Sequence, residues 1–297
     1  MENSRNGILA ISADLCSQIA KSALMAVPPI RRWRIRRPRT SFYIGDTDAY
    51  LENNAFPGLN LLIEHTGEIQ GSSICEIGAG DFLTSGLSML AAGARSYTVI
   101  DRFPGDYSGS TAKAMYRKVA DNWARYFPDR PWDNSLDPNV FPECCPDRVT
   151  LLPQPIEDAE VSEKFDIVCS FQVGEHVSNI RAFAEMHNRL LKAGGVAVHR
   201  VDFGPHDVWS HYADPTTFLR FPESIWKLSG SNRGIPNRRR HHEFVDAFQS
   251  AGLQAEVLYT EAFDEATIDF QRLNSRFRSM PAESLLVKTA IYRLRTV

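Results

Sequence analysis

Two acidic residues and two glycines stand at a spacing that suits a ligand containing a nucleotide. Glu76, Gly78 and Gly80 fall close together, and Asp101 follows after one predicted helix and one predicted strand. Glycines allow a sharp turn and let a ligand approach the backbone closely. A carboxylate at the tip of the next strand can hold both hydroxyls of a ribose. Ala79 and Arg102 lie beside these residues, and we include them in the predicted ligand-binding set.

A second group of titratable residues lies further along the chain. It contains Glu175, His176, His199 and His206, in a chain with eight histidines. A histidine that titrates near neutral pH can remove a proton from an alcohol or a phenol. Histidine and aspartate between positions 199 and 206 also suit a divalent metal, but their spacing matches no firm metal template. We therefore predict catalytic side chains here and assign no metal ligand.

Hydrophobic periodicity predicts the elements that position these residues. Residues 74–77 and 97–100 form short apolar runs typical of buried strands, and residues 82–92 have helical spacing between them. The pattern continues with predicted strands at 148–152, 166–171, 196–201, 253–259 and 285–294, and predicted helices at 111–126, 180–191 and 243–251. Ligands of open parallel sheets bind beyond the carboxyl ends of the strands, so both residue groups are expected at one crevice. A dinucleotide fingerprint fits badly, because its third glycine falls on Leu83.

Two motifs carry a resemblance to a known family. The run Glu76-Ile-Gly-Ala-Gly80 with Asp101 resembles the first motif of class I S-adenosylmethionine (SAM)-dependent methyltransferases, although Phe82 stands where many relatives have glycine. The run Gln172-Val-Gly-Glu-His-Val177 resembles the family's L-E-H-V signature. The resemblance covers about residues 71–295. It implies a Rossmann-like α/β fold with a seven-stranded sheet in the order 3-2-1-4-5-7-6, helices on both faces and an N-terminal helical cap.

The same resemblance implies SAM as cofactor and adds further binding residues. Ile156 is expected to pack on the adenine, and Glu157 or Asp158 to accept from its amino group. Phe171 and Gln172 end the fourth strand, where an aromatic face and nearby carboxylates would stabilise the sulfonium cation.

The expected organisation is a cap at residues 1–67 and a SAM-binding catalytic domain at residues 68–297. The domain carries insertions at 128–146 and 203–237, and the second is expected to be a lid or specificity element. The cap contains a basic stretch at 31–39, which we interpret as a solvated linker in preference to an anion-binding arm. Arg238–Arg240 with His241 and His242 would either steer an anionic acceptor or lie on the surface, and we favour the surface.

Composition narrows the class of partner. The net charge of -3 gives no reason to expect a nucleic acid or an anionic membrane. We count no apolar run of the ~18 residues that a membrane span needs, and no secretory signal. Five cysteines, an odd number, favour free thiols in a reducing cytoplasm.

The predicted function is SAM-dependent methylation of a small molecule at oxygen or nitrogen, in biosynthesis or secondary metabolism. The fourth strand is followed by Ser170-Phe-Gln-Val173 and not by the N-P-P-Y type of tetrapeptide, which argues against methylation of nucleic acid bases. An alternative is a SAM-consuming enzyme of the same fold that cyclises SAM, as in azetidine-2-carboxylate formation, and releases methylthioadenosine. A non-catalytic SAM-binding protein is the least favoured alternative. The acceptor, the metal dependence and the oligomeric state stay open.

Overall fold

The central element is a seven-stranded sheet. A computed structural model describes residues 7–35, 47–67, 69–230 and 234–296. The strand order is β3-β2-β1-β4-β5-β7-β6, which is the order that the family resemblance implies. The strands are β1 (Ser73–Ile77), β2 (Ser96–Ile100), β3 (Val149–Leu152), β4 (Phe165–Phe171), β5 (Leu191–Asp202), β6 (Leu253–Ala262) and β7 (Val287–Thr296). The first five pair in parallel, and β7 runs antiparallel to both of its neighbours.

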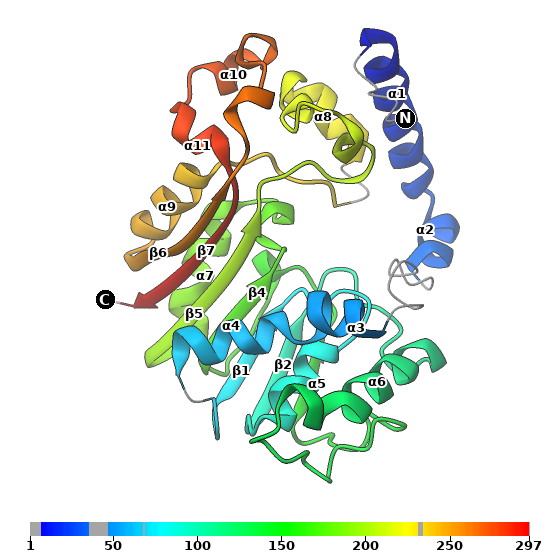
Figure 1. Cartoon of the computed structure of the whole chain (residues 1–297), viewed down its shortest axis with the longest axis vertical. Coiled ribbons are helices and arrows are strands. Elements are labelled where there is room, and N and C mark those ends of the chain that lie inside the picture. Colours follow the sequence, from blue (N-terminus) through cyan, green and yellow to red (C-terminus); the bar gives the residue numbers. More distant parts are fainter. Residues whose placement is uncertain (1–6, 36–46, 68, 231–233, 297) are drawn as a thin grey trace.

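Helices cover both faces of this sheet (Figure 1). One face carries α4 (Pro57–Thr66), α5 (Thr84–Ala91) and α6 (Ser110–Tyr126), and the other carries α7 (Ile180–Leu190) and α9 (His241–Ser250). Side chains alternate along a strand, so Ile74 of β1 belongs to the first of these cores and Cys75 to the second. The predicted insertion at 128–146 has no helix or strand, and its described residues pack beside α6.

The predicted insertion at 203–237 builds a third core beyond the carboxyl ends of the strands. It contains the 3₁₀ segments η4 (Asp207–His211) and η5 (Thr217–Arg220) and the helix α8 (Glu223–Gly230). Trp209, Phe218 and Trp226 pack there with Phe277 of α10 (Ser275–Arg278). The neighbouring α11 (Ala282–Leu286) leads back into β7. We call this unit, residues 207–230 with α10, the lid.

The N-terminal segment is helical, as predicted, but it is divided between two parts of the molecule. The helices α3 (Thr47–Tyr50) and α4, with the π-helical turn η1 (Leu51–Ala55) between them, lie on the sheet domain. The helices α1 (Ile8–Met25) and α2 (Pro28–Ile35) extend away from it, and α1 packs against α8 (Figure 1). The basic stretch 31–39 lies largely outside the described side chains, so its predicted role is untested.

Helix α1 bears on the expectation that no apolar run is long enough for a membrane span. Its 18 residues have a mean hydropathy of 1.3, so by length and composition the helix could cross a membrane, although it contains Asp14 and Lys21. Only 17% of this window is buried. Its buried side includes Gln18 and Ser22, and Asp14 accepts a hydrogen bond from the Tyr212 hydroxyl of the lid at 2.7 Å. One such helix near the N-terminus is weak evidence, and it does not establish a membrane span.

Candidate functional site

A pocket of about 220 Å³ lies at the carboxyl ends of β1, β4 and β5. Six of its lining residues belong to the predicted cofactor set, namely Glu76, Gly78, Ala79, Gly80, Phe171 and Gln172. Its cover comes from Tyr50, Asn53, Pro57, Gly58 and Leu61, which belong to α3, η1 and α4. The predicted glycine turn and the predicted N-terminal cap therefore form opposite walls of one cavity.

The glycine turn adopts the conformation that only glycine accepts easily. Gly78 and Gly80 both have φ of +74°. A Cβ at position 78 would also lie 2.6 Å from the Val173 side chain. Asp101 lies at the tip of β2 and stabilises the turn, because its Oδ2 accepts a hydrogen bond from the Gly80 N–H at 3.0 Å. Its Oδ1 accepts a second hydrogen bond from the Phe103 N–H at 2.6 Å. Burial raises the pKa of Asp101, and its role as ribose ligand remains a prediction.

Glu76 gives the pocket a buried acidic wall. Its side chain is 3% exposed, and its carboxylate accepts a hydrogen bond from the Tyr97 hydroxyl at 2.5 Å. Burial raises the pKa of Glu76 to about 7. A cation that enters this pocket favours the ionised form of Glu76, because opposite charges attract strongly away from water. Glu76 and the neighbouring Asp81 therefore suit a positively charged ligand.

Phe82, which replaces the expected glycine, packs against the cap. Its ring is 5% exposed and meets the Tyr50 ring edge-on, with 6.4 Å between the centroids. The Tyr50 hydroxyl lies 2.8 Å from Thr84 Oγ1 at the start of α5. These two contacts attach the cap to the glycine turn. The sequence pattern gave no signal for Tyr50, Asn53 or Gly58, because their place at the pocket depends on how the cap docks.

The structure does not bring His199 to this pocket, which corrects the prediction of a catalytic role. His199 is fully buried beneath α7 and α9, with its Nδ1 2.7 Å from Ser170 Oγ and its Nε2 2.6 Å from Nε2 of His187. Burial lowers the pKa of both histidines, that of His187 to about 4. Because side chains alternate along β5, the next residue, Arg200, lines the pocket instead. Arg200 is therefore a pocket residue that the sequence pattern did not predict.

The other three predicted catalytic residues do gather in one cluster. Glu175 and His176 lie in the 3₁₀ segment η3 (Gly174–His176), which follows β4, and His206 follows β5. His176 Nε2 lies 3.9 Å from Glu175 Oε1, and the rings of His176 and His206 lie 5.0 Å apart. Asp202 Oδ2 is 3.7 Å from His206 Nε2. The cluster lies close to the pocket in sequence, since Gln172 precedes η3 and Arg200 precedes Asp202.

The charges in this cluster influence one another. Burial raises the pKa of Glu175 to about 8. Burial alone would lower the pKa of His206, but the carboxylates of Asp202 and Glu175 outweigh it and raise that pKa. Burial alone would raise the pKa of Asp202, but His206 and Arg200 contribute to lowering it. Arg200 therefore lines the pocket and also helps to lower the pKa of Asp202 in the cluster.

The remaining predicted residues lie away from the pocket lining. Ile156, in η2 (Ile156–Asp158), is buried in the second core. Glu157 accepts from the backbone N–H and the hydroxyl of Ser178, both at 2.8 Å. Arg102 is exposed, with its guanidinium 5.2 Å from the centre of the Phe103 ring. Their predicted adenine and ribose contacts stay predictions.

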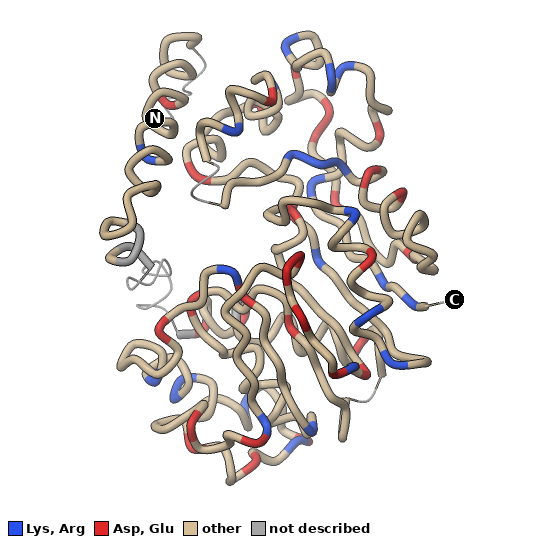
Figure 2. The backbone as a smooth tube through the Cα atoms, turned by 180° about the vertical axis from the view of Figure 1, so that it is seen from behind, with Lys and Arg blue, Asp and Glu red and all other residues tan. Residues whose placement is uncertain are grey.

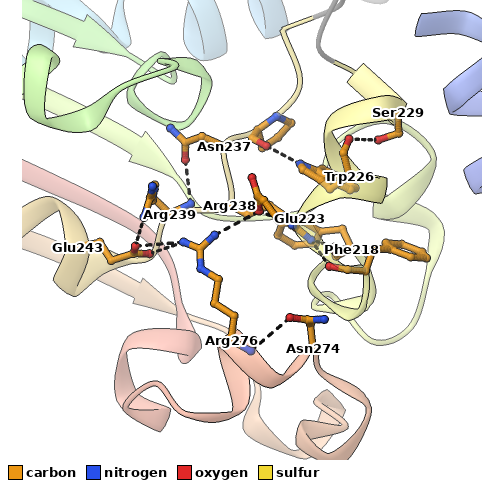
Figure 3. Close-up of polar contacts among 12 residues, drawn as sticks. Phe218, Glu223, Trp226, Ser229, Asn237, Arg238, Arg239, Glu243, Asn274 and Arg276 are labelled. Carbon is orange, nitrogen blue, oxygen red and sulfur yellow. Dashed lines mark hydrogen bonds and ion pairs between the residues drawn. The ribbon is translucent and has the colours of Figure 1, made fainter. Parts of the chain in front are cut away.

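The arginine run before α9 is largely structural, which corrects its expected place on the surface. Arg238 and Arg240 are 2% and 1% exposed. Arg238 donates to the Phe221 carbonyl at 2.7 Å. It also donates to Glu223, beside it in Figure 3, at 2.6 Å. Arg240 donates to the carbonyls of Phe203 and Val287 at 2.8 and 2.9 Å. Only Arg239 is exposed, and it pairs with Glu243.

Comparison with known proteins identifies the family. A family model described as a methyltransferase domain matches residues 49–257, more than half of the chain. A search of curated proteins found no match. Among solved structures, a SAM-dependent methyltransferase from Mesorhizobium loti is 15% identical, with a TM-score of 0.44 over 82% of this chain and 99% of that one. A geranyl diphosphate C-methyltransferase from Streptomyces coelicolor A3(2) is 12% identical, with a TM-score of 0.47 over 88% and 86%. These two likenesses are too low to inform the activity.

Proposed function

Since the chain belongs to the class I SAM-dependent methyltransferases, and is a transferase with SAM as its cofactor, we propose that it methylates a small molecule at oxygen or nitrogen. We place the cofactor in the pocket of Glu76 and the acceptor beside the cluster of Glu175, His176 and His206. The observation that carries the proposal is that the cluster lies on the segments that directly follow β4 and β5, whose Gln172 and Arg200 line the pocket. This position puts titratable groups beside the end of β4 and β5, where a methyl acceptor has to lose a proton.

The proposed chemistry divides between cofactor and protein. SAM, when bound, would supply a methyl group carried on its sulfonium and would leave as S-adenosylhomocysteine. The residues of the pocket hold the reactants at near-attack distance, which supplies much of the rate. Glu76 and Asp81 offset the positive charge of the cofactor. His206 in its neutral form accepts the acceptor's proton, and Asp202 stabilises the resulting cation.

The partner class follows from charge. Basic and acidic residues are interspersed along the described backbone, which supports a small-molecule acceptor in preference to a polyanion (Figure 2). The five cysteines are free thiols, which supports a reducing compartment such as the cytoplasm, and we propose a biosynthetic role there. We propose that residues 1–67 form the cap and that residues 68–297 form the catalytic domain.

The reaction is tested by its products. The purified protein is incubated with SAM alone and with panels of phenols, alcohols and amines. We expect S-adenosylhomocysteine only when an acceptor is present. Release of methylthioadenosine from SAM alone would instead establish the cyclising activity and refute methyl transfer. Turnover only with a nucleic acid would refute the small-molecule acceptor.

A further inference from the structure

We propose that Glu175, His176 and His206 bind a divalent transition-metal ion beside the cofactor pocket. Each residue offers one ligand atom, and these atoms lie within 4.8 Å of one another. For bonds of about 2.0–2.2 Å in a tetrahedral site, ligand atoms lie about 3.3–3.6 Å apart. Small side-chain rotations would therefore close the three donors around an ion.

Two buried polar atoms of the cluster lack a hydrogen bond. Within the described part of the chain, Glu175 Oε1 and His206 Nε2 are buried and form no hydrogen bond. Glu175 is only 2% exposed. A buried polar atom without a partner costs about 1–3 kcal/mol, and more for a charged group. A bound cation would satisfy both atoms at once.

The surrounding chain holds the Glu175–His176 turn firmly. The backbone N–H of Asn237 donates to the Glu175 carbonyl at 2.6 Å, and its side-chain amide donates to the carbonyls of Gly174 and Val177 at 2.9 and 3.0 Å. Asn237 in turn is fixed by the Arg239 N–H, which donates to its Oδ1 at 2.9 Å (Figure 3). Metal sites depend on such outer contacts to orient their ligands.

The donor set indicates the class of metal and its use. Two imidazoles and one carboxylate bind zinc in catalytic sites, and iron(II) and related transition ions in others, with a position left open. The side chains of His176 and His206 are 32% and 26% exposed, so an open position would face solvent or an acceptor. Zinc lowers the pKa of a bound water strongly, and it would do the same for an acceptor hydroxyl. This use rests on the proposed function, and in it the ion, not His206, promotes loss of the proton.

The binding itself is tested without SAM. Protein freed of metal by chelator is titrated with Zn²⁺ by calorimetry. We expect one site, with affinity at least tenfold weaker in Glu175→Gln and in His206→Ala. The matched variant His211→Ala removes an exposed histidine of the neighbouring η4 and should bind as the parent does. All titrations are made in a Cys144→Ser/Cys145→Ser background, since these adjacent thiols could bind zinc themselves.

A second measurement guards against misfolding of a variant. Co²⁺ bound to the parent should give visible d–d absorption without a thiolate charge-transfer band. Glu175→Gln keeps the shape of the side chain, including the Oε2 position that accepts from the Asp202 N–H at 3.4 Å, so its circular dichroism should be unchanged. Absence of saturable Zn²⁺ binding, or equal binding by both ligand variants, would overturn the metal site. Methyl transfer that persists in chelator would overturn only the catalytic use.

Discussion

Neighbouring side chains on β5 have opposite surroundings. His199 is buried between α7 and α9, and Arg200 lines the pocket that contains Glu76. A buried parallel strand is apolar on both faces, so residues 196–201 carry no alternation that tells one face from the other. The chemistry of a histidine is therefore no guide to its position, and only the folded register assigns it.

The buried histidine pair predicts that acid destabilises the fold. In an unfolded chain histidine titrates near ~6.5. In the fold the pKa of His187 falls to about 4 and that of His199 falls well below its ordinary value. Their contribution is complete above ~6.5 and is lost as the pH falls toward 4, because the unfolded state then binds more protons. The free energy of unfolding should drop by about 1.4 kcal/mol per pH unit for each histidine.

Urea unfolding between pH 7 and pH 5 measures this slope. His187→Leu/His199→Leu should flatten it, whereas His211→Gln controls for removing an exposed imidazole. A slope that survives in the double variant would refute this role of the pair.

Asp101 is the residue on which cofactor binding should depend most. Asp101→Ala removes the acceptor for the Gly80 N–H as well as the predicted ribose ligand. Hydrogen bonds to a charged group contribute about 1.5–3 kcal/mol, so SAM affinity should fall roughly 10- to 150-fold. Calorimetry measures this against Asp147→Ala, which removes an exposed aspartate near β3. Unchanged affinity in Asp101→Ala would refute the assignment.

At the scale of elements, the sequence predicted the sheet better than the cap. Short apolar runs separated by glycine turns identify the strands of a doubly wound sheet, and the order of β1 to β7 was confirmed. Gly78 and Gly80 were also predictable, because a tight turn restricts the residue type. Tyr50 and Gly58 were not, because their contacts with Thr84 and Phe171 join segments that are distant in sequence.

Because α4 lies close to β4 at Gly58, we expect substitution of this glycine to weaken SAM binding. A Cβ at Gly58 would lie 2.6 Å from the Phe171 ring, which lines the pocket. Gly58→Ala should therefore displace the ring or lift α4, and SAM affinity should fall about tenfold, or 1.4 kcal/mol. Gly7→Ala is the control, since its added methyl meets nothing within 4 Å. Equal SAM affinities of Gly58→Ala and Gly7→Ala in a titration would contradict this expectation, because they would show that α4 can move without affecting cofactor binding.

The contacts of Arg238 suggest that this residue stabilises the lid. Its guanidinium lies 5.0 Å from the centre of the Trp226 ring and 5.3 Å from that of Phe277, besides its bonds to Phe221 and Glu223. Arg238→Met should lower the free energy of unfolding by about 2–4 kcal/mol, because buried carbonyls lose their donor. Arg239→Ala, an exposed neighbour in a surface ion pair, should cost less than about 1 kcal/mol. Thermal unfolding of both variants measures these changes. Similar losses of unfolding free energy in Arg238→Met and Arg239→Ala would refute a special role of Arg238 in stabilising the lid.

At the scale of the whole molecule, the described helices of the N-terminal segment contact two separate parts of the protein. Helix α1 packs on α8 of the lid, and α4 covers the pocket in which we propose that SAM binds. Where binding at α1 and binding at the pocket are coupled, thermodynamic reciprocity sets the size of the effect. A partner that binds the exposed side of α1 then changes SAM affinity by the same factor by which SAM changes the affinity of that partner.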